Sequence, residues 1–76
     1  MTAAVPVDPT HYTYRVTWSA EDGEFVAVCV ELPSLSWLAA GPHEALTGVE
    51  RVAAEAVSDM HANDEEVPVP LAERRY

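Results

Sequence analysis

Four acidic residues near the middle of the sequence have side chains that could hold divalent metal ions. They are Glu21, Asp22, Glu24 and Glu31. Two-metal nucleases use such carboxylates, and they hold them in a fixed geometry around the reacting phosphate. Three of the four acids fall in a predicted turn here, so a residual metal-dependent nuclease is not the favoured interpretation. The two other interpretations are a solvated turn and an acidic rim around a surface that binds a partner.

The histidines and the cysteine do not form a recognisable site. His11, His43 and His61 fall in an arm, at a helix start and at a helix end, and no two share a helix face at ligand spacing. Cys29 is the only cysteine and lies inside an apolar run, so we expect a buried thiol without a disulfide partner. The sequence contains no nucleophile elbow, phosphate loop or dinucleotide fingerprint. We therefore expect no enzymatic activity, no bound metal and no cofactor.

The net charge excludes one class of partner and favours another. Thirteen acidic residues oppose four arginines, with no lysine, for a formal charge of -9. Direct nucleic-acid binding needs a basic patch, and the pair Arg74 and Arg75 is too small to supply one. A basic partner protein fits, because opposite fields steer association. Solubility is the alternative explanation, since a large net charge keeps small proteins apart.

Length and hydropathy indicate one small domain outside the membrane. Seventy-six residues make a single domain. The longest uninterrupted apolar run, residues 25–30, is far shorter than the about 20 residues that a membrane span needs. Residues 1–11 contain neither a basic residue nor an apolar core, so they do not resemble a signal peptide. We expect a cytoplasmic protein with no membrane partner.

Three strands are predicted in the first half of the chain. Residues 12–19 alternate, with one face to be buried by Tyr12, Tyr14, Val16 and Trp18. Residues 20–24 form a turn, whose Asp-Gly pair suits the positive φ of a hairpin. Residues 25–30 form a strand that is apolar on both faces, with Phe25, Ala27 and Cys29 on one and Val26, Val28 and Val30 on the other. A short third strand covers residues 35–39, with Leu35 and Trp37 on one face.

A long amphipathic helix is predicted next. Gly41 can cap it and Pro42 suits its first position, where a missing N–H has no consequence. Apolar residues then recur every three or four positions up to residues 60–61, although Gly48 costs the helix about 1 kcal/mol relative to alanine. Residues 67–71 are extended and contain two prolines, so they can form only an edge strand or a covering arm.

These elements define an α+β fold, an antiparallel three-stranded sheet with one helix on one face and an extended C-terminal edge segment. The domain is expected to span residues 11–71, between a flexible arm at residues 1–10 and a tail at residues 72–76. One helix covers one sheet face, so the other face of the middle strand, formed either by Val26, Val28 and Val30 or else by Phe25, Ala27 and Cys29, needs another cover. Three buried aliphatic side chains contribute about 1.5–3 kcal/mol each, too much to leave in water in so small a domain. We expect a second copy or another protein to cover that face. The alternative is that the arm or the tail folds over it.

The order of these motifs resembles the HicB family of antitoxins. The family pattern runs from an acid-acid-Gly-x-aromatic turn through Pro-Glu-Leu-Pro-Gly and Glu-Ala-Leu to a late Pro-x-Pro. The matching positions lie between residues 12 and 76 and are Glu21, Asp22, Gly23, Phe25, Glu31, Leu32, Pro33, Glu44, Ala45, Leu46, Pro68 and Pro70. Two positions depart from the pattern: Ser34 stands where the family prefers glycine, and Gly41 stands where it prefers serine or threonine.

The resemblance implies a degenerate RNase H-like domain without nuclease activity. It implies a partner, a small basic HicA-like toxin that cleaves mRNA, whose catalytic surface the antitoxin blocks. Family members bind DNA through a C-terminal domain, and the tail resembles the junction before such a domain, so we expect DNA contacts only through a domain absent from this chain. A homodimer or higher homo-oligomer is expected. The alternative function is a stand-alone oligomeric scaffold or transcriptional co-regulator without a toxin.

The candidate binding residues fall into two groups. A polar rim with an aromatic anchor is assigned to Glu21, Asp22, Glu24, Glu31 and Trp37. The oligomer or partner face of the sheet is assigned to Val26, Val28 and Val30.

Overall fold

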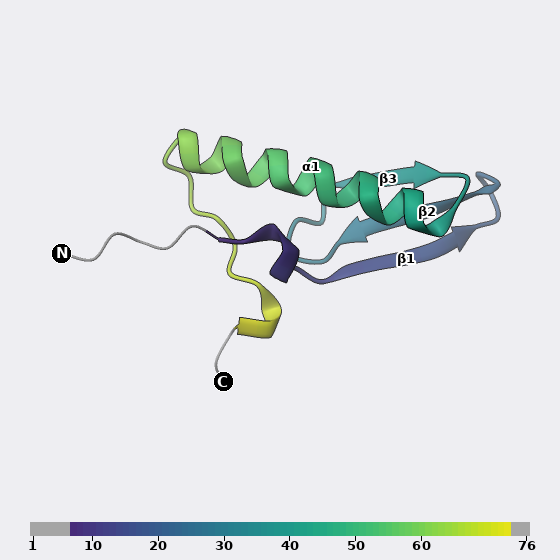
Figure 1. The fold of residues 1–76 in the computed structure, drawn as a ribbon, viewed down its shortest axis with the longest axis horizontal. Helices are drawn as coiled ribbons and strands as arrows, with labels where there is room; N and C mark the ends of the chain where they lie inside the picture. Colours follow the sequence, from purple (N-terminus) through teal and green to yellow (C-terminus); the bar gives the residue numbers. More distant parts are fainter. Residues whose placement is uncertain (1–6, 74–76) are drawn as a thin grey trace.

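The structure is a computed structural model that describes residues 7–73. A three-stranded antiparallel sheet in the order β1-β2-β3 carries one long helix, with strands β1 (Tyr14–Ser19), β2 (Glu24–Cys29) and β3 (Ser36–Ala39) and helix α1 (Pro42–Ala62) (Figure 1). Two short 3-10 turns, η1 (Pro9–His11) and η2 (Leu71–Glu73), lie near the ends of the described chain. The predicted α+β fold class is confirmed, whereas the RNase H-like assignment stays a prediction.

The alternation of the strands decides which face α1 covers. Val16 lies opposite Ala27, and Ala27 lies opposite Trp37, so these three share one face of the sheet. Ala27 and Cys29 have no exposed surface and join the buried stripe of α1 in one core. The buried core consists of Tyr12, Ala27, Cys29, Leu32, Ala45, Val49, Ala53 and Val57. The core is therefore one layer thick, between the sheet and a single helix.

Helix α1 begins where its sequence predicts. Gly41 occupies the N-cap in an extended conformation (φ -119°, ψ 153°), and Pro42 takes the first helical position. Glu44 lies in the first turn, where its negative charge suits the positive end of the helix dipole. At the other end the Asn63 N–H donates to the Asp59 carbonyl oxygen (3.0 Å). The predicted helix is thus confirmed over its whole length.

The hairpin between β1 and β2 extends beyond the N-terminal end of α1 (Figure 1). The alternation predicts a buried Trp18, and this part of the prediction is wrong, because the side chain is 57% exposed. Its ring instead packs edge-on against Phe25, with ring centroids 5.1 Å apart and an interplanar angle of 70°. Within residues 7–73, no element covers this face of the sheet beyond the N-terminal end of α1.

The chain segments that flank the domain meet at the end of the sheet away from the hairpin. The Tyr12 hydroxyl donates to the Pro68 carbonyl oxygen (2.8 Å), and Pro70 is fully buried. Residues 65–70 form neither strand nor helix, so the segment predicted as an edge strand or a covering arm is a covering arm. Part of the predicted flexible arm is structured too, because the Asp8 carboxylate accepts the Thr10 N–H (2.9 Å) and caps η1. Residues 1–6 and 74–76 lie outside the described part.

Candidate partner-binding surface

One face of the sheet is turned away from α1, and we call it the open face. Val26 of β2 pairs with Thr17 on one side and Leu38 on the other, and Val28 pairs with Arg15 and Ser36. The Val30 N–H donates to the Thr13 carbonyl oxygen (2.9 Å), which continues the same alternation by one more pair. The open face therefore includes Arg15, Thr17, Val26, Val28, Val30, Ser36 and Leu38.

The open face is apolar along its centre and incompletely buried. Val26, Val28 and Val30 are half-buried, and Leu38 beside them is 40% exposed, whereas Ala27 on the opposite face is fully buried. The sequence left open which face of β2 would lack cover, and the structure assigns α1 to the face of Phe25, Ala27 and Cys29. Within residues 7–73, neither flanking segment buries the valines.

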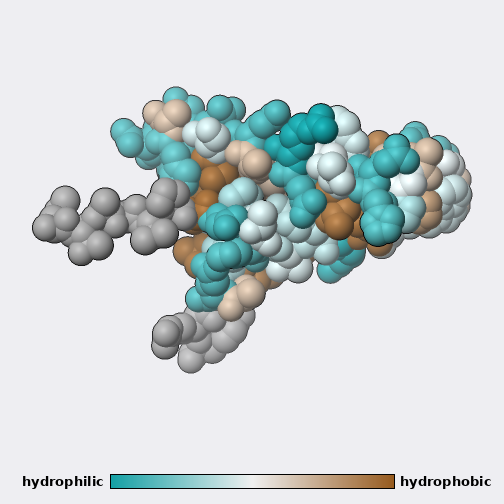
Figure 2. All heavy atoms as spheres, viewed as in Figure 1, coloured by the Kyte–Doolittle hydropathy of each residue, from teal (hydrophilic) through white to brown (hydrophobic). Residues whose placement is uncertain are grey.

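The opposite side of the molecule has a different surface. Figure 2, drawn from the same direction as Figure 1, shows hydrophilic residues over the outer side of α1, interrupted by small hydrophobic areas. Glu50 is half-buried on α1, and Arg51 and Glu55 are exposed, as an amphipathic helix requires. The outer side of α1 is a solvated helix face, and the apolar strip that lacks cover lies on the sheet.

Three of the four predicted rim acids lie at the hairpin end of the open face. Glu24 pairs with Ser19 and, by alternation, projects from the same face as Val26. Glu21 and Asp22 are exposed in the turn, where the Ser19 hydroxyl donates to the Asp22 carboxylate (2.8 Å) and Gly23 has φ +62°. These contacts hold the acids at one end of the apolar strip.

Glu31 lies elsewhere, at the far end of the sheet, and is 8% exposed. Its carboxylate accepts the Thr13 N–H on both oxygens (2.9 and 3.1 Å) and the Leu71 N–H on Oε2 (2.9 Å). Burial raises the pKa of Glu31, but the hydrogen bonds from Leu71 and Thr13 outweigh it and bring the pKa below its usual value. The side chain thus joins the start of β1, the end of β2 and the C-terminal segment.

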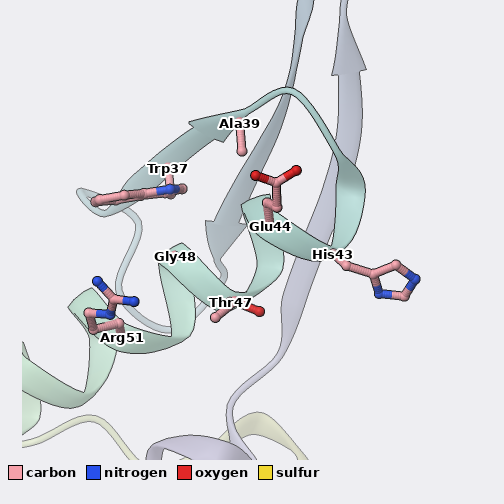
Figure 3. A pocket seen from close by; sticks show the side chains of 7 residues that line it. All are labelled: Trp37, Ala39, His43, Glu44, Thr47, Gly48 and Arg51. Atoms are coloured by element: carbon pink, nitrogen blue, oxygen red, sulfur yellow. The ribbon is translucent and has the colours of Figure 1, made fainter.

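Trp37 lies on the helix side of β3, away from the valines. Figure 3 shows its indole ring above the backbone of Gly48, beside a shallow pocket of about 380 Å³ between β3 and the first turns of α1. A Cβ atom added at Gly48 would lie 2.1 Å from Trp37 Cδ1, so only glycine lets the ring approach the helix this closely. The ring is 39% exposed, with Glu44 and Arg51 at the pocket rim.

Two features of the surface were not predicted. Leu38 extends the valine strip onto β3, and the alternation of β3 around Trp37 could have placed it there. Gly48 was treated as an unfavourable helix residue, because nothing local in the sequence shows that an indole from β3 packs on it. Its effect is tertiary, and it appears only once β3 lies alongside α1.

In residues 7–73 no group of three or more His, Cys, Asp or Glu side chains is placed to hold a metal ion. No helix in that range combines the length and the apolar character needed to cross a membrane.

No known protein family matches the chain, and no similar protein was found among curated proteins or solved structures.

Proposed function

We propose that the chain is a protein-binding module whose open face docks a basic partner, and that it acts as an antitoxin of the HicAB type. The partner would be a small basic toxin that cleaves mRNA, and the function would be exercised in the cytoplasm. The observation that supports the proposal is the apolar strip of Val26, Val28, Val30 and Leu38, which α1 leaves uncovered.

The apolar strip can supply useful binding energy. Complete burial of a valine or leucine side chain contributes about 1.5–3 kcal/mol, and these side chains have at most about a third of that burial still to gain. Four of them therefore offer at most about 2–4 kcal/mol, which corresponds to about one and a half to three orders of magnitude in affinity. A partner that shields this strip from water gains more than it would from a polar face of equal area.

The charges support a basic partner. The chain carries a net charge of -9, and Glu21, Asp22 and Glu24 lie at one end of the strip. Such an arrangement accelerates encounter with a basic surface and disfavours acidic competitors. The mechanism that we propose is occlusion, in which the carboxylates compete with RNA phosphates for the basic surface of the toxin. The chain itself performs no chemistry in this mechanism.

The test measures whether the chain binds and inhibits the protein encoded by the neighbouring gene. Val28→Asp places a charge at the centre of the open face, where the side chain is half-buried and lies outside the core cluster. We expect binding to weaken by at least about tenfold and inhibition of RNA cleavage to weaken in parallel. Ala54→Asp adds the same charge on the exposed side of α1 and is the matched control.

The results separate the candidate functions. Loss of binding in Val28→Asp with retention in Ala54→Asp supports the antitoxin proposal. Equal binding by both variants contradicts it. If the wild-type chain does not bind the neighbouring protein and leaves its RNA cleavage unchanged, the stand-alone scaffold or co-regulator takes its place.

A further inference from the structure

The strand β3 is an edge of the sheet with an unoccupied hydrogen-bonding side. Within residues 7–73 its one neighbouring strand is β2 (Figure 1). Leu38 on one face of β3 and Trp37 on the other are 40% and 39% exposed. An exposed edge strand of this kind is a template for pairing with another chain.

The ladder shows which backbone groups of β3 face outward. The Val30 N–H donates to Thr13 across the β1–β2 ladder, so by alternation Val28 and Val26 direct their backbone groups to β1. Ala27 and Phe25 then direct theirs to β3, where their opposite residues are Trp37 and Ala39. The N–H and C=O groups of Leu38, between those two, therefore point away from β2 toward the open edge.

The stretch of sequence that contains β3 carries no charge in a strongly acidic chain, and the nearest charges that line its helix side are Glu44 and Arg51 of α1. Residues 32–42, which include all of β3 and its flanks, contain no Asp, Glu, Lys or Arg, although the chain as a whole carries thirteen acids and four arginines. Exposed edges are commonly protected by lysine, proline, a bulge or an inward-pointing charge. Strand β3 (Ser36–Ala39) contains neither a charge nor a proline. A strand edge without a charge or a proline to prevent pairing is suited to stay paired with another strand.

We propose that β3 pairs with β3 of a second copy of this chain, antiparallel, so that the two sheets become one six-stranded sheet. An edge-to-edge antiparallel pair related by a two-fold axis requires that axis to be normal to the sheet. Residues that stand opposite each other across the pair then project from the same face of the joint sheet, and both α1 helices lie on one side of that sheet. The register that uses the outward backbone groups of Leu38 sets Leu38 against Leu38 of the second copy.

This register also fits the side chains. It sets Trp37 against Ala39 of the second copy, so the large indole meets a small residue on the helix side. On the other side the two apolar strips become continuous through the paired Leu38 side chains. The pairing at the sheet edge is separate from the proposed function, because it shares only Leu38 with the open face and leaves Val26, Val28 and Val30 accessible to a partner.

A second copy suits this edge better than a strand of an unlike protein. The pairing is self-complementary under the two-fold axis, and it brings the charge-free stretches of two acidic chains together while their charged parts stay apart. Each copy carries -9, so the two repel at long range, and salt screens that repulsion. We therefore expect the dimer to tighten as salt concentration rises.

The first test is the mass in solution by sedimentation equilibrium. The wild-type chain is expected at twice its monomer mass of 8.3 kDa. Leu38→Lys places two lysines opposite each other and removes the contact between the paired leucines, so we expect its dimer dissociation constant to rise by at least about a hundredfold. Thr17→Lys makes the same charge change on the open face of β1, away from the edge, and should remain dimeric.

The second test is hydrogen exchange of the wild-type Leu38 amide, which does not depend on a variant that folds. In a monomer this N–H points to solvent and exchanges rapidly, whereas in the dimer it is bonded across the edge and its protection rises with protein concentration. A monomeric wild type, an unprotected Leu38 amide or a Leu38→Lys variant that remains dimeric would each overturn the proposal. Loss of toxin binding in a dimer that persists would reject the proposed function alone.

Discussion

Replacing the buried Glu31 by glutamine is expected to destabilise the protein far more than the same carboxylate-to-amide change at an exposed acid. The carboxylate is 8% exposed and accepts the Thr13 and Leu71 N–H groups and the Thr13 hydroxyl (3.2 Å). Glutamine keeps one acceptor oxygen at this place and turns an N–H₂ group toward donors. The glutamine N–H₂ group then faces a backbone N–H group, so two donors meet at a place where the ionised carboxylate accepted a hydrogen bond.

The expected loss can be estimated from these contacts. Hydrogen bonds to a charged group contribute about 1.5–3 kcal/mol each, against about 0.5–1.5 kcal/mol for neutral pairs. Removing the charge weakens two such backbone bonds and deprives at least one donor of a good partner. We expect Glu31→Gln to lower the free energy of unfolding by about 2–3 kcal/mol, a large share of the stability of so short a chain.

The loss depends on pH in a defined direction. The pKa of Glu31 lies below its usual value in the folded state, so the fold stabilises the ionised form. Its contribution is complete above the ordinary glutamate pKa of about 4.3 and declines as pH falls through the folded-state value. The difference between wild type and Glu31→Gln should thus be largest near neutral pH and shrink in acid.

Urea unfolding at a series of pH values measures this difference. Glu55→Gln changes the net charge equally at an exposed position on α1 and should alter the free energy of unfolding by less than about 0.5 kcal/mol. The reasoning is refuted if the two variants are equally stable at neutral pH, or if the deficit of Glu31→Gln stays constant into acid. Faster exchange of the Leu71 amide in Glu31→Gln would show that the C-terminal segment has detached.

Three further predictions concern other parts of the molecule. Gly48→Ala gains about 1 kcal/mol of helix propensity but forces the Trp37 ring off the helix, so we expect a net loss of about 1 kcal/mol and a red-shifted tryptophan emission. Cys29 has no exposed surface and burial raises the pKa of its thiol, so a thiol reagent should label it only as fast as the protein unfolds. Reversing the charges of Asp22 and Glu24 to lysine should slow association with a basic partner and flatten its salt dependence, and unchanged rates at low and high salt would remove the electrostatic part of the proposal.

The elements of the fold are predictable from the sequence because their periodicities are local. The alternation of residues 12–19, the Asp-Gly turn and the stripe that starts after Pro42 each specify one element without reference to the others. The two-sided apolar character of β2 likewise predicts that one face lacks cover. Which face that is depends on where α1 packs, and the sequence does not contain that choice in any single segment.

The roles of Glu31 and Gly48 could not be predicted because they depend on contacts distant in sequence. Glu31 binds Leu71, forty positions along the chain, and was assigned to a solvent-facing rim on the basis of its charge and its neighbours in sequence. Gly48 matters because Trp37 packs on it from another element. The residue type says only that Glu31 is acidic and that Gly48 weakens a helix. Burial and contacts with distant residues decide whether each of them stabilises the fold.

The two proposed surfaces respond to salt in opposite directions, and this difference allows one titration to separate them. Binding of a basic partner at the open face joins opposite charges and should weaken as salt rises. Pairing of β3 edges joins two chains of charge -9 and should strengthen over the same range. Leu38 belongs to both surfaces, so its substitution affects both equilibria, whereas Val28→Asp should weaken partner binding and leave the edge intact. A dimer that weakens with salt in step with partner binding would mean that one interface, and not two, accounts for both.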